Sequence, residues 1–146
     1  MAPLRVVVID DSDDLRHLIR RRLELEGGFE VVGDAADGTS GLAVAEEAQP
    51  DVVLLDLMLG HEDGAELVGP LMRSCPRTMI AAFSALAPES EEARLRRLGA
   101  FSYYPKEASE SLAVWLREDH ERFVRALAGE DVVAPSALTR PRREHD

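Results

Sequence analysis

The sequence has few of the features that would place it in a membrane or in an oxidising compartment. Cys75 is the only cysteine among 146 residues, so no disulfide can form within the chain. No apolar run approaches the length that spans a bilayer, and the segment ahead of the first predicted strand is too short for a signal peptide. These absences lead us to expect a soluble, cytoplasmic protein in a reducing environment.

Positive charge is also scarce. Lys and Arg total 17 against 28 Asp and Glu, which gives a formal net charge of -11. An acidic surface repels the phosphates of nucleic acids, so we expect no direct binding of nucleic acid by this chain. The hydrophobic share of 45% is sufficient for one domain with a core of ordinary size.

The chain does contain a regular alternation of strand-like and helical segments. The central strand-like segment is Asp51–Asp56, in which four apolar residues lie between two aspartates. Such a run is typical of a strand that is buried on both faces of a parallel sheet. The other predicted strands are Val6–Ile9, Phe29–Gly33, Thr78–Phe83 and Ala100–Tyr104. The predicted helices run from Ser12 or Asp13 to Gly27, then over Gly41–Ala48, Ala65–Arg73, Pro88–Leu98 and about Ser109–Ala128.

This alternation predicts the fold class. Strands that are separated by single helices must be parallel, with right-handed crossovers. We therefore expect an α/β fold, a three-layer doubly wound (flavodoxin-like) five-stranded parallel sheet in the order 2-1-3-4-5 with five helices. Residues 57–64 are expected to form a loop, and Pro70 should kink or shorten the third helix. The domain should cover residues 1–129, followed by a tail or linker remnant over residues 130–146.

Polar residues lie where the predicted strands end. They are Asp10, Asp11, Asp56, Ser84 and Lys106. Because the carboxyl ends of parallel strands share one edge of the sheet, we expect these side chains to meet in one cleft. Three crowded carboxylates need a cation, and their oxygen atoms favour Mg²⁺ or Mn²⁺. Lysine and serine beside such a cation would suit a tetrahedral anion, and Asp56 could attack a phosphoryl group to give an acyl phosphate.

The sequence resembles the receiver domains of two-component response regulators, in particular receivers that precede helix-turn-helix output domains. The matching segments are Val8–Ser12, Val32–Gly38, Pro50–Asp56, Asp63-Gly64, Phe83–Ala85 and Gly99–Lys106. They span about residues 4–128, so the resemblance implies that residues 1–129 form a receiver domain. Two readings of the chain stay open, a stand-alone receiver and the receiver part of a DNA-binding regulator whose helix-turn-helix domain is absent here.

The resemblance implies an acceptor and a metal site. Asp56 would accept a phosphoryl group from a sensor histidine kinase. Asp10, Asp11, Asp56 and the backbone carbonyl of Met58 would hold Mg²⁺ or Mn²⁺. The chain would then act as a phosphoacceptor that assists its own phosphorylation and dephosphorylation, and not as a turnover enzyme.

The resemblance also implies a switch. Lys106 would contact the phosphoryl group, Ser84 would hydrogen-bond to it, and Tyr103 would swing inward when the Ser84 loop closes. The face formed by the fourth helix, fifth strand and fifth helix would then control an effector protein or a homodimer. No membrane partner is implied.

Two departures from the family pattern motivate an alternative. Gly60 stands in a loop where receivers usually have proline, and Lys106 is followed by Glu107 where many have proline. A receiver-like interaction module that works without phosphorylation is therefore a second hypothesis. An independent Mg²⁺-dependent phosphatase is a third, although Met58 stands where the haloacid-dehalogenase-like phosphatases would supply a second aspartate.

Overall fold

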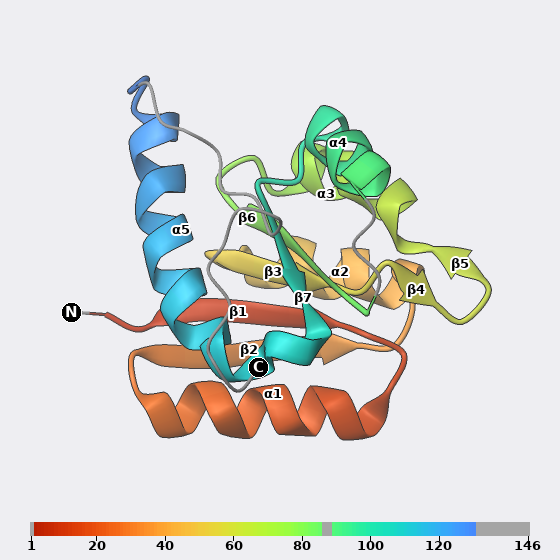
Figure 1. Ribbon diagram of the computed structural model, residues 1–146, viewed down its shortest axis with the longest axis horizontal. Helices are drawn as coiled ribbons and strands as arrows, with labels where there is room; N and C mark the ends of the chain where they lie inside the picture. Colours follow the sequence, from red (N-terminus) through yellow and green to blue (C-terminus); the bar gives the residue numbers. More distant parts are fainter. Residues whose placement is uncertain (1, 86–88, 131–146) are drawn as a thin grey trace.

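The computed structural model describes residues 2–85 and 89–130 and contains a five-stranded parallel sheet between layers of helices (Figure 1). The strands are β1 (Leu4–Ile9), β2 (Phe29–Ala35), β3 (Val52–Leu55), β6 (Met79–Ser84) and β7 (Ser102–Pro105). They pair in the order β2-β1-β3-β6-β7, with every pair parallel. The predicted order 2-1-3-4-5 is thus confirmed, because β4 and β5 form a separate small sheet.

The helices begin and end at residues that suit these positions. They are α1 (Asp13–Glu26), α2 (Gly38–Ala48), α3 (Val68–Ser74), α4 (Glu89–Leu98) and α5 (Leu112–Leu127). Ser12 caps α1 by accepting a hydrogen bond from the Leu15 amide at 3.2 Å. Helix α2 begins three residues earlier than predicted, because Asp37 caps it by accepting from the Ser40 amide at 2.8 Å.

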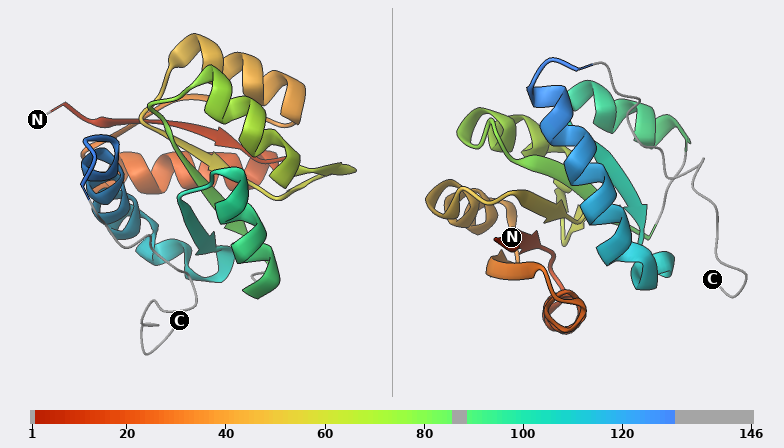
Figure 2. Two further views of the ribbon diagram at one scale, coloured as in Figure 1. Left: turned by 90° about the horizontal axis from the view of Figure 1, so that it is seen from above. Right: turned by 90° about the vertical axis from the view of Figure 1, so that its left-hand side faces the viewer.

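Alternate residues of the central strands point into two separate cores. Val6 and Val8 of β1 pack with residues of α1 and α5, whereas Val7 and Ile9 pack with residues of α2, α3 and α4. Figure 2 shows the sheet between α1 and α5 on one side and α2 and α3 on the other. Because β1, β3 and β6 are covered on both faces, their carboxyl ends are held firmly relative to one another.

The segment that follows β3 differs from the prediction. Where we expected a loop over residues 57–64, β4 (Met58–Leu59) and β5 (Glu62–Asp63) form an antiparallel hairpin. Gly60 turns this hairpin with a φ of 61°. The expected third helix is divided into a 3-10 turn, η1 (Gly64–Leu67), and α3, which contains Pro70 in its first turn.

The segment that follows β7 also differs. A 3-10 helix, η2 (Lys106–Ser111), precedes α5, so α5 starts three residues later than predicted. Pro88, the predicted start of α4, and the predicted tail from Asp131 onward lie outside the described residues. Among the described helices, none has both the length and the apolar character that a bilayer crossing requires.

Position 64 requires glycine, because η1 passes close to the backbone at the end of β3. A Cβ at this position would lie 2.1 Å from the backbone oxygen of Asp56. Gly64→Ala should therefore destabilise the protein by about 3 kcal/mol, because backbone must move to make room. Urea unfolding followed by circular dichroism measures this.

Gly69→Ala is the matched control for that prediction. A Cβ at Gly69 would meet Arg73 at 3.4 Å, an ordinary contact with a flexible side chain, within the helix α3. Alanine has the higher helix propensity, but a Cβ directly before Pro70 disfavours the helical conformation, so this variant should differ from the wild type by no more than about 1 kcal/mol in either direction. Equal losses of stability in the two variants would contradict the steric argument.

Candidate functional site

Backbone hydrogen bonds fix two aspartates at the carboxyl edge of the sheet. The Asp10 amide donates to the Ala35 carbonyl at 3.0 Å, and the Asp56 amide donates to the Ile9 carbonyl at 2.9 Å. Both residues thus continue the ladder by one position beyond β1 and β3. Asp10 is 1% and Asp56 4% exposed, whereas the neighbouring Asp11 is exposed. The predicted juxtaposition of these acids is present.

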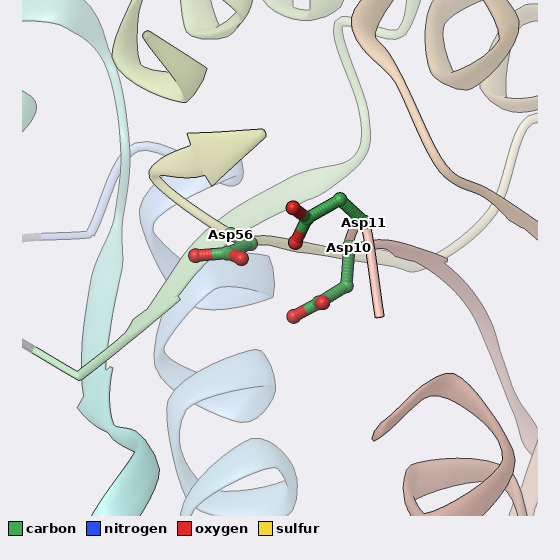
Figure 3. Close-up of side chains that lie close together, drawn as sticks. All are labelled: Asp10, Asp11 and Asp56. Carbon is green, nitrogen blue, oxygen red and sulfur yellow. The ribbon is translucent and has the colours of Figure 1, made fainter. Parts of the chain in front are cut away.

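The three carboxylates form one cluster. One oxygen atom from each of Asp10, Asp11 and Asp56 lies within 4.8 Å of the others, and Figure 3 shows the side chains that β1 and β3 bring together. Oδ2 of Asp10 is buried, and its near neighbour is Nζ of Lys106 at 3.0 Å. Three carboxylates that offer oxygen atoms this close together fit a small hard cation such as Mg²⁺.

Three backbone amides orient the carboxylates. The Ser12 amide donates to Oδ1 of Asp10 at 2.9 Å, and the Met58 amide donates to Oδ1 of Asp56 at 3.0 Å. The Gly60 amide donates to Oδ2 of Asp11 at 3.2 Å. Two of these donors come from the β4–β5 hairpin, so the hairpin is part of the site. The ligand role of the Met58 carbonyl stays a prediction.

Lys106 places one ammonium group between the two buried acids. Its Nζ lies 3.0 Å from Oδ2 of Asp10 and 3.1 Å from Oδ2 of Asp56, and 5.9 Å from the centre of the Phe83 ring. Burial alone would lower the pKa of Lys106, but Asp10 and then Asp56 outweigh it and raise that pKa. The lysine is therefore charged at neutral pH.

The surroundings of Asp56 disfavour its ionised form. Burial raises the pKa of Asp56 above its ordinary value, and the charge of Asp10 raises it further. The hydrogen bond from the Met58 amide and the contact with Lys106 act in the opposite direction but do not cancel the rise. Bringing a second cation into this site would relieve the repulsion.

Ser84 and Tyr103 lie on the adjacent strands. Ser84 ends β6, is buried, and pairs in register with Pro105 of β7. Tyr103 is 2% exposed, so its ring already lies inside the protein. Burial raises the pKa of Tyr103, and the nearby Ser84 hydroxyl lowers it in part, although the Tyr103 hydroxyl makes no well-formed hydrogen bond with a described residue. Their switching roles stay predictions.

Arg16 was missed by the sequence analysis. Its guanidinium donates to the backbone carbonyl of Asp10 at 2.6 Å. Its spacing could have indicated this contact. Arg16 lies one helical turn after the cap Ser12, so its side chain is near the Asp10-Asp11 turn.

Comparisons with known proteins agree on one family. A family model described as the response regulator receiver domain matches residues 6–114. A protein-glutamate methylesterase/protein-glutamine glutaminase of Geobacter sulfurreducens is 34% identical over 143 residues, which cover 95% of this chain and 39% of that protein. A homologue from Anaeromyxobacter dehalogenans is 36% identical and is covered to 41%. The chain therefore spans about two fifths of the length of these curated relatives.

Solved structures show the same fold. The receiver domain of the putative response regulator NarL of Mycobacterium tuberculosis is 28% identical with a TM-score of 0.76, covering 83% of this chain and 98% of that one. The response regulator domain of Thermotoga maritima CheB is 25% identical with a TM-score of 0.73, covering 89% and 99%. A Burkholderia pseudomallei regulator, solved with a phosphorylated aspartic acid, calcium and citrate, is 26% identical with a TM-score of 0.73, covering 89% and 76%.

The raised pKa of Asp56 leads to a prediction about stability. A raised folded-state pKa means that this group stabilises the fold most below its unfolded pKa, and that the contribution is lost as the pH rises. Ionised Asp56 therefore destabilises the metal-free protein at pH 7. Asp56→Asn should raise the melting temperature in EDTA by roughly 3 °C, the effect of about 1 kcal/mol in a chain of this size.

Asp37→Asn is the control for that prediction. The hydrogen bond from the Ser40 amide lowers the pKa of Asp37, so its carboxylate contributes stability that is lost only as the pH falls. Asp37→Asn should therefore leave the melting temperature at pH 7 unchanged or slightly lower. Adding Mg²⁺ should raise the melting temperature of the wild type and of Asp37→Asn more than that of Asp56→Asn. A lower melting temperature for Asp56→Asn in EDTA would contradict the argument.

Proposed function

Because this chain belongs to the response regulator receiver domain family, we propose that it is a phosphorylation-controlled switch of two-component signalling. Asp56 is the phosphoacceptor, and a sensor histidine kinase in the cytoplasm is the donor. The observation that supports this most strongly is the position of the Asp56 carboxylate, which lies beside Asp10 and Asp11 and 3.1 Å from Nζ of Lys106. Both neighbours are what a transferring phosphoryl group needs.

The acidic cluster gives the site its requirement for a divalent cation. Asp10, Asp11 and Asp56 would hold Mg²⁺, together with the Met58 carbonyl as a further expected protein ligand. The bound ion supplies positive charge that offsets the repulsion between these carboxylates and an incoming phosphoryl group. The calcium ion and phosphorylated aspartic acid of the Burkholderia pseudomallei regulator support this assignment.

The side chains of the protein then direct the transfer. The Met58 amide holds the Asp56 carboxylate in one orientation, so that an oxygen atom can attack phosphorus. The bond between phosphorus and the donor histidine nitrogen breaks as the bond to Asp56 forms. Lys106 stabilises the charge on the phosphoryl oxygens, and the Ser84 hydroxyl donates to one of them. Each phosphoryl group is held until hydrolysis, so this is a signalling step and not substrate turnover.

The output of the switch is the face formed by α4, β7 and α5. Ser84 and Tyr103 connect the phosphorylation site to this face, because one ends β6 before α4 and the other lies in β7. The face would control an effector or a second copy of the chain. The relatives include methylesterases and LuxR-family regulators, which share the receiver and differ in output, so the proposal is confined to the receiver.

The alternative of a module that works without phosphorylation is less well supported. It was motivated by Gly60 and Glu107, yet Lys106 still reaches Asp56, and Gly60 contributes a hydrogen bond to Asp11. Both departures thus leave the charged groups of the site in place.

Phosphorylation of Asp56 can be tested with a small donor. Incubation with acetyl phosphate and Mg²⁺ should add the mass of one phosphoryl group to the intact protein, and Asp56→Asn should abolish the addition. EDTA should also abolish it, because the carboxylates then repel the donor. Lys106→Ala should slow the reaction by about 100-fold, the usual effect of losing one electrostatic stabiliser. Intact-mass spectrometry over time measures all four.

The control is Asp37→Asn, which removes a carboxylate at the start of α2 without touching the cluster and should be phosphorylated like the wild type. Phosphoryl label that persists in Asp56→Asn, or an unmodified wild-type mass under conditions in which Mg²⁺ binds, would argue against the proposal.

A further inference from the structure

The acidic site is supported from α1 by Arg16. We propose that Arg16 is a positioning residue that fixes the Asp10-Asp11 turn in the conformation that binds the divalent cation. This inference rests on the proposed function, because it concerns the same cation site. It assigns a role to a residue that neither touches the phosphoryl group nor binds the ion.

The Arg16 guanidinium is held at each of its three nitrogen atoms. Nη1 donates to the Asp10 carbonyl at 2.6 Å, Nε donates to Oδ2 of Asp34 at 3.3 Å, and Nη2 pairs with Asp13. The side chain is only 13% exposed. A fork that is fixed on two sides by acids from α1 and β2 presents its remaining donor to Asp10 in one direction.

The Asp10 carbonyl belongs to the peptide group that leads into Asp11. The other end of Asp10 is fixed by the bond from its amide to Ala35, and its side chain is fixed by the Ser12 amide. Arg16 therefore completes the restraint on this residue and sets the direction in which the chain enters Asp11. Among the described residues, the Asp11 carboxylate is otherwise restrained by the hydrogen bond from the Gly60 amide, at 3.2 Å.

The direction in which Mg²⁺ affinity changes distinguishes a positioning role of Arg16 from a purely electrostatic one. A guanidinium next to a cation site repels the cation, so a purely electrostatic role predicts tighter Mg²⁺ binding when the charge is removed. Positioning predicts weaker binding when the fork is lost, even if the charge is kept. Arg16→Lys keeps the charge and removes the fork, so it isolates the geometric contribution.

Arg20 provides a matched control, because it makes a similar contact one helical turn further along α1. Its Nη1 donates to the backbone carbonyl of Val31 at 3.1 Å, in β2 and away from the acidic cluster. Arg20→Lys should therefore weaken the contact between α1 and β2 without disturbing the Asp10-Asp11 turn. If Arg16 only attached the helix, the two lysine variants would behave alike.

The experiment is a calorimetric titration of the metal-free chain with MgCl₂. Arg16→Lys should raise the dissociation constant for Mg²⁺ roughly tenfold, the lower end of the effect of losing a partner of a ligating group. Arg20→Lys should stay within about twofold of the wild type, since no contact with the cluster is lost. In the acetyl phosphate reaction, Arg16→Lys should need more Mg²⁺ for half-maximal rate yet approach the wild-type rate at saturation. An unchanged or lower dissociation constant for Arg16→Lys would overturn the inference.

A second pair of variants keeps the test decisive if Arg16→Lys does not fold. Asp34→Ala removes the acceptor of Arg16 Nε without touching Asp10, and Asp37→Asn removes an equal negative charge three residues further along, at the cap of α2. Asp34→Ala should weaken Mg²⁺ binding more than Asp37→Asn does. Equal effects would mean that Asp34 acts only through its negative charge, and would overturn the inference. Failure of the proposed function looks different, because the wild type would then bind Mg²⁺ without becoming phosphorylated.

Discussion

The main electrostatic constraint on the structure is an excess of negative over positive charge at the carboxyl edge of the sheet. Asp10 and Asp56 are buried, and one ammonium group, that of Lys106, lies within 3.1 Å of both. A third carboxylate, Asp11, completes the cluster. Buried charges that are only partly compensated cost stability, and two cores around the central strands supply the stability that tolerates this cost. A site that is unfavourable on its own gains most from binding a cation, and through it a phosphoryl group.

Backbone geometry holds these charges in place. The carboxylates extend the strand ladder by one residue, and amides from the loops that follow the strands orient them. The hairpin after β3 is therefore more than a connection, because its amides donate to Asp56 and Asp11, and Gly64, which follows it, lies too close to the Asp56 backbone oxygen for a Cβ. Displacement of an acid would also have to displace the hairpin, so occupancy of the site and the shape of this loop are coupled.

The sequence predicted the sheet and the acids, and it failed where tertiary contacts decide. Runs such as Val52–Leu55 identify buried strands by composition, and strand ends locate Asp10 and Asp56. The β4–β5 hairpin was missed because strands of two residues carry no periodicity. Arg16 was missed because a helical pattern shows which face is polar and does not show which carbonyl an arginine reaches. Ser84 was located by its place at the end of a predicted strand, whereas the role of Tyr103 came only from the family resemblance, since a tyrosine within a strand has no distinctive pattern.

The two departures from the family pattern have physical consequences that can be read from the site. Proline has no amide hydrogen, so the hydrogen bond from residue 60 to Asp11 requires a residue other than proline, here Gly60. Glycine also adopts the φ of 61° that turns the hairpin. Beyond β7, Glu107 is exposed and Lys106 still meets both buried acids. A proline at position 60 would make the loop more rigid, whereas Gly60 provides a hydrogen-bond donor to Asp11. Among the three carboxylates, Asp11 is the most exposed and has the fewest other restraints from described residues.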